Sequence, residues 1–153
     1  MNAKYELVLT DTKQHFCKTL YRIRALVEIG AIVSAGDLGG YVEYEKNLSL
    51  SGDAWVSGNA WVSGNAWVYG NARVYGDARV LSTTDYLIVG PAKSSYRFTT
   101  AYKDSKIGVR VSCGCFTGTV KEFSDAVEKT HAGNKEHLEQ YRLFVQLIAF
   151  NFG

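Results

Sequence analysis

The chain has 153 residues, 46% of them hydrophobic and 21% charged, which is the composition of an ordinary globular domain. A formal charge of +2 is too small for a protein that coats nucleic acid, so direct nucleic-acid binding is not expected. The sequence shows no long apolar run and no secretion signal near Met1, so we expect a cytoplasmic protein without membrane contact. Glycine is the informative residue, because 15 glycines stand against one proline.

Residues 1–39 are predicted to form a β-hairpin that caps the rest of the fold. Residues 5–10 are apolar and rich in strand-forming types, and residues 20–29 largely alternate apolar and polar side chains. Repeat folds expose unpaired backbone at their ends, so an atypical segment of this kind is expected to cover the first repeat. Arg22 and Arg24 are interpreted as solvated edge charges or, alternatively, as contacts for an anion.

Five six-residue repeats follow without interruption from residue 52 to residue 81. They read GDAWVS, GNAWVS, GNAWVY, GNARVY and GDARVL. Glycine followed by Asn or Asp tolerates a positive φ, so each repeat is predicted to turn the chain sharply. Ala and Val, two positions apart in every repeat, point to the same side of an extended segment and are predicted to face inward. Two weaker units extend the pattern upstream, which places the repeat region at residues 40–81.

The literal GNAxVx units resemble the hexapeptide-repeat superfamily of left-handed β-helix proteins, which includes acyltransferases and gamma-class carbonic anhydrases. There, three hexads make one triangular coil, so the resemblance implies a mainly β fold with a short left-handed β-helix of about two coils. With AGDLGGYVE before the repeats and VSCGCFTGT after them, the chain looks like small uncharacterised proteins of phages and prophages. A coil of about 18 residues would stack Trp55 with Arg73 and Trp61 with Arg79 as cation–π pairs.

Residues 82–118 are predicted to form a second β-hairpin, with strand-like runs at 96–102 and 107–112 on either side of a polar KDSK turn. Residues 93–110 hold five basic residues against one acid, a formal charge of +4. We expect these charges to protect the hairpin edges or, alternatively, to bind an anion such as a nucleotide phosphate or an acidic partner protein. The five basic residues are Lys93, Arg97, Lys103, Lys106 and Arg110.

Residues 119–153 are predicted to form two helices, which complete one compact domain. TVKE at 119–122 matches a capping box, and the helix that it begins is expected to stop before Gly133. A second helix over residues 135–150 ends in apolar turns, LFVQLIAF, that we expect to be buried. Cys113 and Cys115 are interpreted as buried thiols rather than half of a zinc site, because no second pair of ligands has suitable spacing.

The outward side chains of the repeats supply the candidate binding site. An exposed belt of tryptophan marks a contact surface, so we expect the terminal segments or a neighbouring subunit to cover it. The enzymes that the repeats resemble form trimers with sites between subunits, which implies a homotrimer whose clefts bind a ligand. The candidate ligand-binding residues are Trp61, Tyr69, Arg73, Tyr75, Arg79, Arg97, Lys103, Lys106 and Arg110.

We expect a non-catalytic protein that holds a small anionic, nucleotide-like ligand through aromatic stacking and through Arg and Lys contacts to phosphate. The resemblance to phage proteins implies sequestration of a nucleotide signal of host defence. One alternative is an interaction protein that inhibits a host defence protein through its Trp and Tyr faces. Another is an acyl-coenzyme-A-dependent acyltransferase, for which His15, His131 or His137 would have to reach a repeat region without histidine. No catalytic residue, metal ligand or cofactor is predicted.

Overall fold

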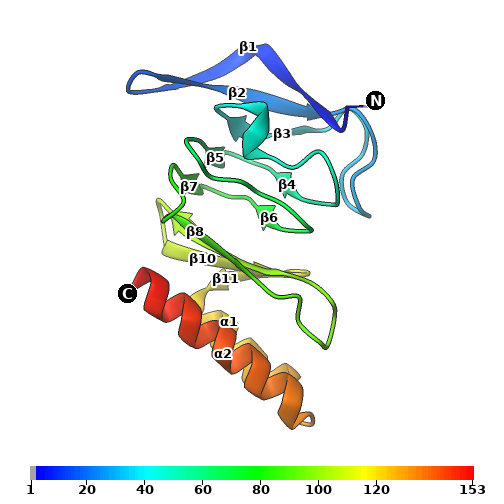
Figure 1. The fold of residues 1–153 in the computed structure, drawn as a ribbon, viewed down its shortest axis with the longest axis vertical. Helices are drawn as coiled ribbons and strands as arrows, with labels where there is room; N and C mark the ends of the chain where they lie inside the picture. The colour runs from blue at the N-terminus through cyan, green and yellow to red at the C-terminus, as the bar shows by residue number, and fades with distance from the viewer. Residues whose placement is uncertain (1–2) are drawn as a thin grey trace.

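The computed structural model describes residues 3–153 and arranges three sheets and two helices along its long axis (Figure 1). The first sheet is mixed and has the order β1 (Tyr5–His15), β2 (Lys18–Ala25), β3 (Leu38–Val42), β5 (Trp61–Val62) and β7 (Arg79–Val80). The second is a parallel pair of β4 (Trp55–Val56) and β6 (Arg73–Val74). The third is antiparallel and has the order β11 (Phe116–Thr119), β10 (Gly108–Cys113), β9 (Thr99–Asp104) and β8 (Tyr86–Val89). Helices α1 (Val120–Thr130) and α2 (Lys135–Phe152) lie at the end opposite β1 (Figure 1).

The expectation of a mainly β fold built on a left-handed β-helix of about two coils is wrong. Residues 3–153 form three separate sheets and two helices, and none of these sheets closes on itself or winds as a solenoid. The repeats contribute strands of only two residues, and these are divided between two sheets. At Val68 the repeat region has a single bridge, to Leu48, in place of a ladder of pairs. Strands so short and so divided do not make the continuous parallel sheets that the resemblance implied.

The geometry of a single repeat is as the sequence predicts. The first glycine of every repeat has a φ between +63° and +73°, where other residues are strained. Gly52 also needs the space, because a Cβ there would lie 2.5 Å from the carbonyl oxygen of Gly70. The inward Ala and Val side chains are all buried in one hydrophobic core: Ala54, Val56, Ala60, Val62, Ala66, Val68, Ala72, Val74, Ala78 and Val80.

The repeats pair in parallel at a spacing of 18 residues where the sequence is most regular, with Trp55 opposite Arg73. The two weaker units upstream depart from this pattern. Tyr41 lies opposite Trp61, a spacing of 20, and the chain between them includes a 3-10 turn, η1 (Glu45–Asn47). One side chain expected to face inward is exposed in each of these units: Tyr44 in the first and Leu50 in the second.

Both hairpins expected on either side of the repeats are present, and further strands extend each of them. β1 and β2 pair antiparallel, although β2 ends at Ala25 rather than near residue 29. Pairing continues through β3 to β5, so the N-terminal hairpin covers the first repeats by direct backbone hydrogen bonding. β9 and β10 form the second hairpin between β8 and β11. Tyr102 of β9 inserts into the core of the repeats, where its hydroxyl oxygen accepts a hydrogen bond from the N–H of Tyr75.

The two helices begin and end close to where the sequence predicts. Thr119 and Glu122 form the expected capping box at the start of α1. α2 packs on a second hydrophobic core beneath the antiparallel sheet through Tyr141, Phe144 and Ile148. The expected burial of its last turns is wrong for one face, where three apolar side chains are exposed: Leu143, Leu147 and Phe150. In the described part of the chain, neither helix combines the length and apolar character that a membrane span requires.

Gly52→Ala is expected to lower the free energy of unfolding by about 3 kcal/mol or more, because the added Cβ meets a backbone carbonyl at a positive φ. Gly36 is the matched control, since its φ of +94° is also positive but a Cβ there meets no atom within 4 Å. Gly36→Ala should therefore cost only about 1 kcal/mol. Urea denaturation measures both changes. Equal losses of unfolding free energy in the two variants would contradict the claim that the close approach of Gly52 to Gly70 requires glycine.

Candidate functional site

Two adjoining cavities open beside strand β6, and Arg73 lines both of them. They measure about 470 Å³ and 390 Å³, which is within the range of small-molecule sites. Their walls come from the β2–β3 loop, from β4 and β6, from the loop before β9 and from the β10–β11 turn. We call the two cavities together the Arg73 cleft, and the residues that define it here are Trp55, Arg73, Tyr75, Arg97, Phe98 and Cys115.

Two guanidinium groups face the Arg73 cleft, and glycine makes room for each of them. The Nη2 atom of Arg73 lies 2.9 Å from the position of a Cβ on Gly30, and Nη1 of Arg97 lies 2.8 Å from that of a Cβ on Gly114. Arg73 is half-buried, whereas Arg97 is exposed. Among residues 3–153, neither guanidinium has an ion pair or a hydrogen-bond acceptor. Asp53 lines the same cavity and its negative charge acts on Arg73, so a ligand of these donors would share the site with one carboxylate.

The charges around the Arg73 cleft are mixed, because two acids, Asp37 and Asp53, line it beside Arg73 and Arg97. Burial lowers the pKa of Arg73 below its ordinary value, and the negative charge of Asp53 offsets this only in part. Lys4 lies close by with its ammonium group buried, and it donates hydrogen bonds to the carbonyl oxygens of Ser49 and Ala54. Burial lowers the pKa of Lys4 to about 8, against the attraction of Asp53 and with the help of repulsion from Arg73. Lys4 is thus still largely charged at neutral pH, and a bound anion would relieve the repulsion.

Aromatic side chains line the Arg73 cleft and continue beyond it. Trp55 and Tyr75 line the larger cavity, and Phe98 lines the smaller one. Tyr69 lies edge-on to Phe98, with 6.2 Å between ring centroids. Trp67 packs on Tyr69 at 4.7 Å and is itself 49% exposed. An aromatic surface therefore leads from the guanidinium groups to the outside of the repeats.

The structure brings Arg73, Tyr75 and Arg97 together from the residues predicted to bind a ligand, and it places Tyr69 beside them. Trp61 and Arg79 instead belong to the five-stranded sheet. There the guanidinium of Arg79 lies 4.2 Å from the centroid of the Trp61 ring, which confirms one of the two predicted cation–π pairs. The other is not found among residues 3–153, where Trp55 and Arg73 are opposite each other in β4 and β6 without such a contact. The pair of Trp61 and Arg79 stands on a different sheet from β4 and β6, outside the residues that line the cleft.

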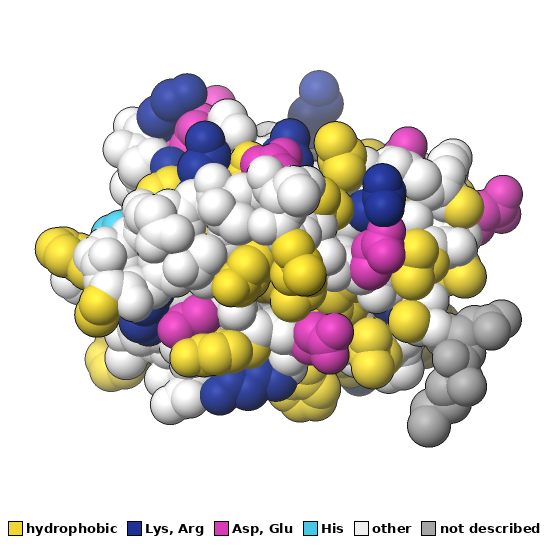
Figure 2. Space-filling model, turned by 90° about the horizontal axis from the view of Figure 1, so that it is seen from above, with side chains coloured by type: hydrophobic (Ala, Val, Ile, Leu, Met, Phe, Trp, Pro, Cys, Tyr) yellow, Lys and Arg dark blue, Asp and Glu magenta, His cyan; other side chains and the backbone are white. Residues whose placement is uncertain are grey.

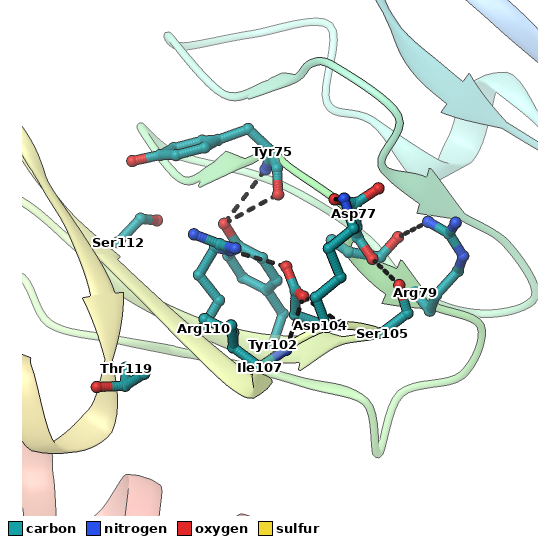
Figure 3. A network of polar contacts seen from close by, with 12 residues as sticks. Tyr75, Asp77, Arg79, Tyr102, Asp104, Ser105, Ile107, Arg110, Ser112 and Thr119 are labelled. Atoms are coloured by element: carbon teal, nitrogen blue, oxygen red, sulfur yellow. Dashed lines mark hydrogen bonds and ion pairs between the residues drawn. The ribbon is translucent and has the colours of Figure 1, made fainter.

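The remaining predicted basic residues are all paired with acids, Arg110 within the β9–β10 hairpin (Figure 3) and the two lysines with acids outside it. Arg110 donates a hydrogen bond from Nε to the fully buried carboxylate of Asp104 at 2.8 Å. Burial alone would raise the pKa of Asp104, but hydrogen bonds from Arg110 and from two backbone N–H groups hold it below its ordinary value. Acids elsewhere in the chain thus neutralise most of the positive charge that the sequence shows here. Two further pairs are Lys103 with Asp85 and Lys106 with Asp77.

The three tryptophans are covered to very different extents. Trp55 is buried, with Tyr5 of β1 edge-on to it at 6.4 Å. Trp61 is half-buried beside His15, the last residue of β1. The N-terminal segment therefore covers Trp55 and Trp61, in agreement with the expectation that a terminal segment covers the tryptophans. Trp67 stays exposed. Figure 2, which looks onto the β1 end, shows hydrophobic side chains interspersed with charged ones rather than one continuous apolar patch.

Several residues that line the Arg73 cleft could not be predicted from the sequence. Ile32 and Asp37 come from an irregular loop, and Gly114 lies in the turn after β10. Their approach to Arg73 depends on packing between segments that are far apart in the chain. Trp55 is different, because the spacing of the repeats already places it beside Arg73.

The cysteines are free thiols, but the expectation that both members of the Cys113–Cys115 pair are buried is wrong. Cys113 is half-buried, and its sulfur accepts a hydrogen bond from the Thr99 hydroxyl group. Cys115 is exposed at the mouth of the Arg73 cleft. Within residues 3–153, no cluster of His, Cys, Asp and Glu side chains is arranged to hold a metal ion.

No known family model matches the chain, and a comparison with curated proteins finds no match either. The resemblance to hexapeptide-repeat proteins of phages therefore stays an expectation.

Arg110→Met is expected to lower the free energy of unfolding by about 3 kcal/mol, because it leaves the buried Asp104 carboxylate without its cation. Arg97→Met is the matched control, since it removes a guanidinium that is exposed and has no acidic partner among the described residues. Its effect should stay within about 0.5 kcal/mol. Urea denaturation of both variants measures the difference, and a loss at Arg97 as large as that at Arg110 would contradict these assignments.

Proposed function

We propose that this protein is a non-catalytic binding protein for a small anionic ligand of the nucleotide type, held in the Arg73 cleft. The observation that carries the proposal is the pair of guanidinium groups, Arg73 and Arg97, that line one cavity together with a single carboxylate, that of Asp53. Burial removes part of the hydration of Arg73. Phosphate oxygens restore those hydrogen bonds, and the planar guanidinium group can make two at once.

The rest of the Arg73 cleft supports a ligand larger than a simple ion. Its two cavities offer about 470 Å³ and 390 Å³, more than an inorganic phosphate fills. Trp55, Tyr75 and Phe98 add apolar walls next to the guanidinium groups. A ligand with a phosphate at one end and a flat ring at the other fits this combination of walls.

The cleft lies within a single chain, so the proposed binding does not depend on an interface between subunits. The homotrimer stays a prediction. Sequestration of a nucleotide signal of host defence by a phage protein likewise rests on the resemblance alone. The proposal that follows from the geometry is the narrower one, which is capture of the anion by Arg73 and Arg97.

A second candidate function is binding of another protein, which was the first alternative from the sequence. The exposed apolar face of α2 favours it, because Leu143, Leu147 and Phe150 lie on successive turns of one side of the helix. A contact there would leave the Arg73 cleft open. The two functions are therefore compatible and can be tested separately.

Thermal-shift measurements with mononucleotides, dinucleotides and cyclic dinucleotides are expected to show stabilisation of several degrees by one of these classes. Arg73→Met should weaken the affinity for that nucleotide about tenfold or more, because a charged hydrogen bond contributes about 1.5 to 3 kcal/mol. Arg79→Met is the matched control, since Arg79 occupies the same position in the next repeat but stacks on Trp61. The affinity of Arg79→Met for the nucleotide should equal that of the wild type. No stabilisation of the wild type by any nucleotide, or an equal loss in both variants, would contradict the proposal.

A further inference from the structure

We infer that Trp67 and Tyr69 form a second subsite, next to the guanidinium groups, that holds the base of the nucleotide. This inference rests on the proposed function and narrows it. The ligand is then recognised by an aromatic base as well as by its phosphate, which excludes inorganic phosphate and sugar phosphates as the preferred ligands.

One stretch of chain carries both subsites. Between residues 67 and 73 the inward positions are taken by Val68 and Ala72, which are buried. Trp67 and Tyr69 therefore stand on the outside of one repeat and Arg73 on the outside of the next, with the turn at Gly70 between them. A ligand bound to Arg73 and Arg97 would reach Tyr69 and Trp67 across the ring of Phe98, which lines the smaller cavity and contacts Tyr69.

Phe98 fixes the two subsites relative to each other. Its N–H donates a hydrogen bond to the side-chain oxygen of Asn71 at 3.1 Å. Its ring packs so closely on the neighbouring turn that a Cβ on Gly70 would lie 3.0 Å from it. The same ring lines the smaller cavity and lies edge-on to Tyr69. The loop that carries Arg97 is thus attached to the stretch that carries Trp67 and Arg73.

Trp67 has the properties of a stacking surface that the other two tryptophans lack. Trp55 is only 3% exposed, and Trp61 is covered by Arg79 and His15. Trp67 is 49% exposed, and its ring is tilted by 33° from that of Tyr69, so the two rings splay apart instead of stacking face to face. Its backbone N–H donates to the Tyr86 hydroxyl group at 2.9 Å, which fixes the position of the residue. Every base has a flat π-face, so an open indole is a suitable surface for it.

Isothermal titration calorimetry with two probes tests the base subsite: the nucleotide that stabilises the wild type most, and inorganic pyrophosphate. Trp67→Leu should weaken nucleotide binding about tenfold, as expected for the loss of one base–aromatic stack, and leave pyrophosphate binding unchanged. Phe150→Leu is the control, because it removes an aromatic side chain that is 87% exposed on α2. It should change neither affinity. Quenching of tryptophan fluorescence by the nucleotide should be smaller in Trp67→Leu than in the wild type and unchanged in Phe150→Leu.

The results separate failure of the inference from failure of the proposed function. If the wild type binds both probes equally and Trp67→Leu keeps its nucleotide affinity within about twofold, the Arg73 cleft stands and the base subsite is overturned. If Trp67→Leu weakens both probes alike, a general disturbance of the cleft explains the loss, and the base subsite is again overturned. If the wild type binds neither probe, the proposed function fails and the inference fails with it.

Discussion

Between residues 54 and 80 the buried inward positions of the repeats hold only alanine and valine, and the core that they line also takes in Tyr102 of β9. Every Trp, Tyr and Arg of these repeats must then stand on the outside. Each repeat glycine turns the chain through its positive φ, and after every such turn the side chains again alternate between inward and outward positions. Arg73 is fixed by this constraint, because its neighbours Ala72 and Val74 are both buried while its own side chain points away from the core.

What surrounds Arg73 comes from outside the repeats. The loop at Gly30 and the turn at Gly114 both approach without a side chain, and this leaves room for the guanidinium groups of Arg73 and Arg97. The hairpin that carries the turn is attached by two ion pairs, Lys103 with Asp85 and Lys106 with Asp77, while the buried pair of Arg110 and Asp104 joins its own two strands. Among residues 3–153, Arg97 therefore differs from Lys103, Lys106 and Arg110 in having no acid paired with it.

Local features of the fold could be predicted because each depends on residues close together in sequence. The glycine turns, the inward Ala and Val, and the capping box of Thr119 and Glu122 are examples. The fold class could not, because it depends on pairing between distant strands: the spacing changes from 18 to 20 upstream of Trp61, and each repeat strand has only two residues. In the same way, the outward positions of the repeats predict that Arg73 and Tyr75 are candidate binding residues. Nothing in the sequence shows that Lys106 is paired with an acid and that Arg97, among the described residues, is not.

Nuclear magnetic resonance of the arginine side chains is the most direct test of the claim that Arg73 and Arg97 receive the anion. During titration with the nucleotide that stabilises the protein, the Nε–H signals of these two residues are expected to shift. Those of Arg79, stacked on Trp61, and of Arg110, paired with Asp104, are expected to stay where they are. Nucleotide binding that leaves the signals of Arg73 and Arg97 unmoved, or that shifts those of Arg79 instead, would contradict the claim.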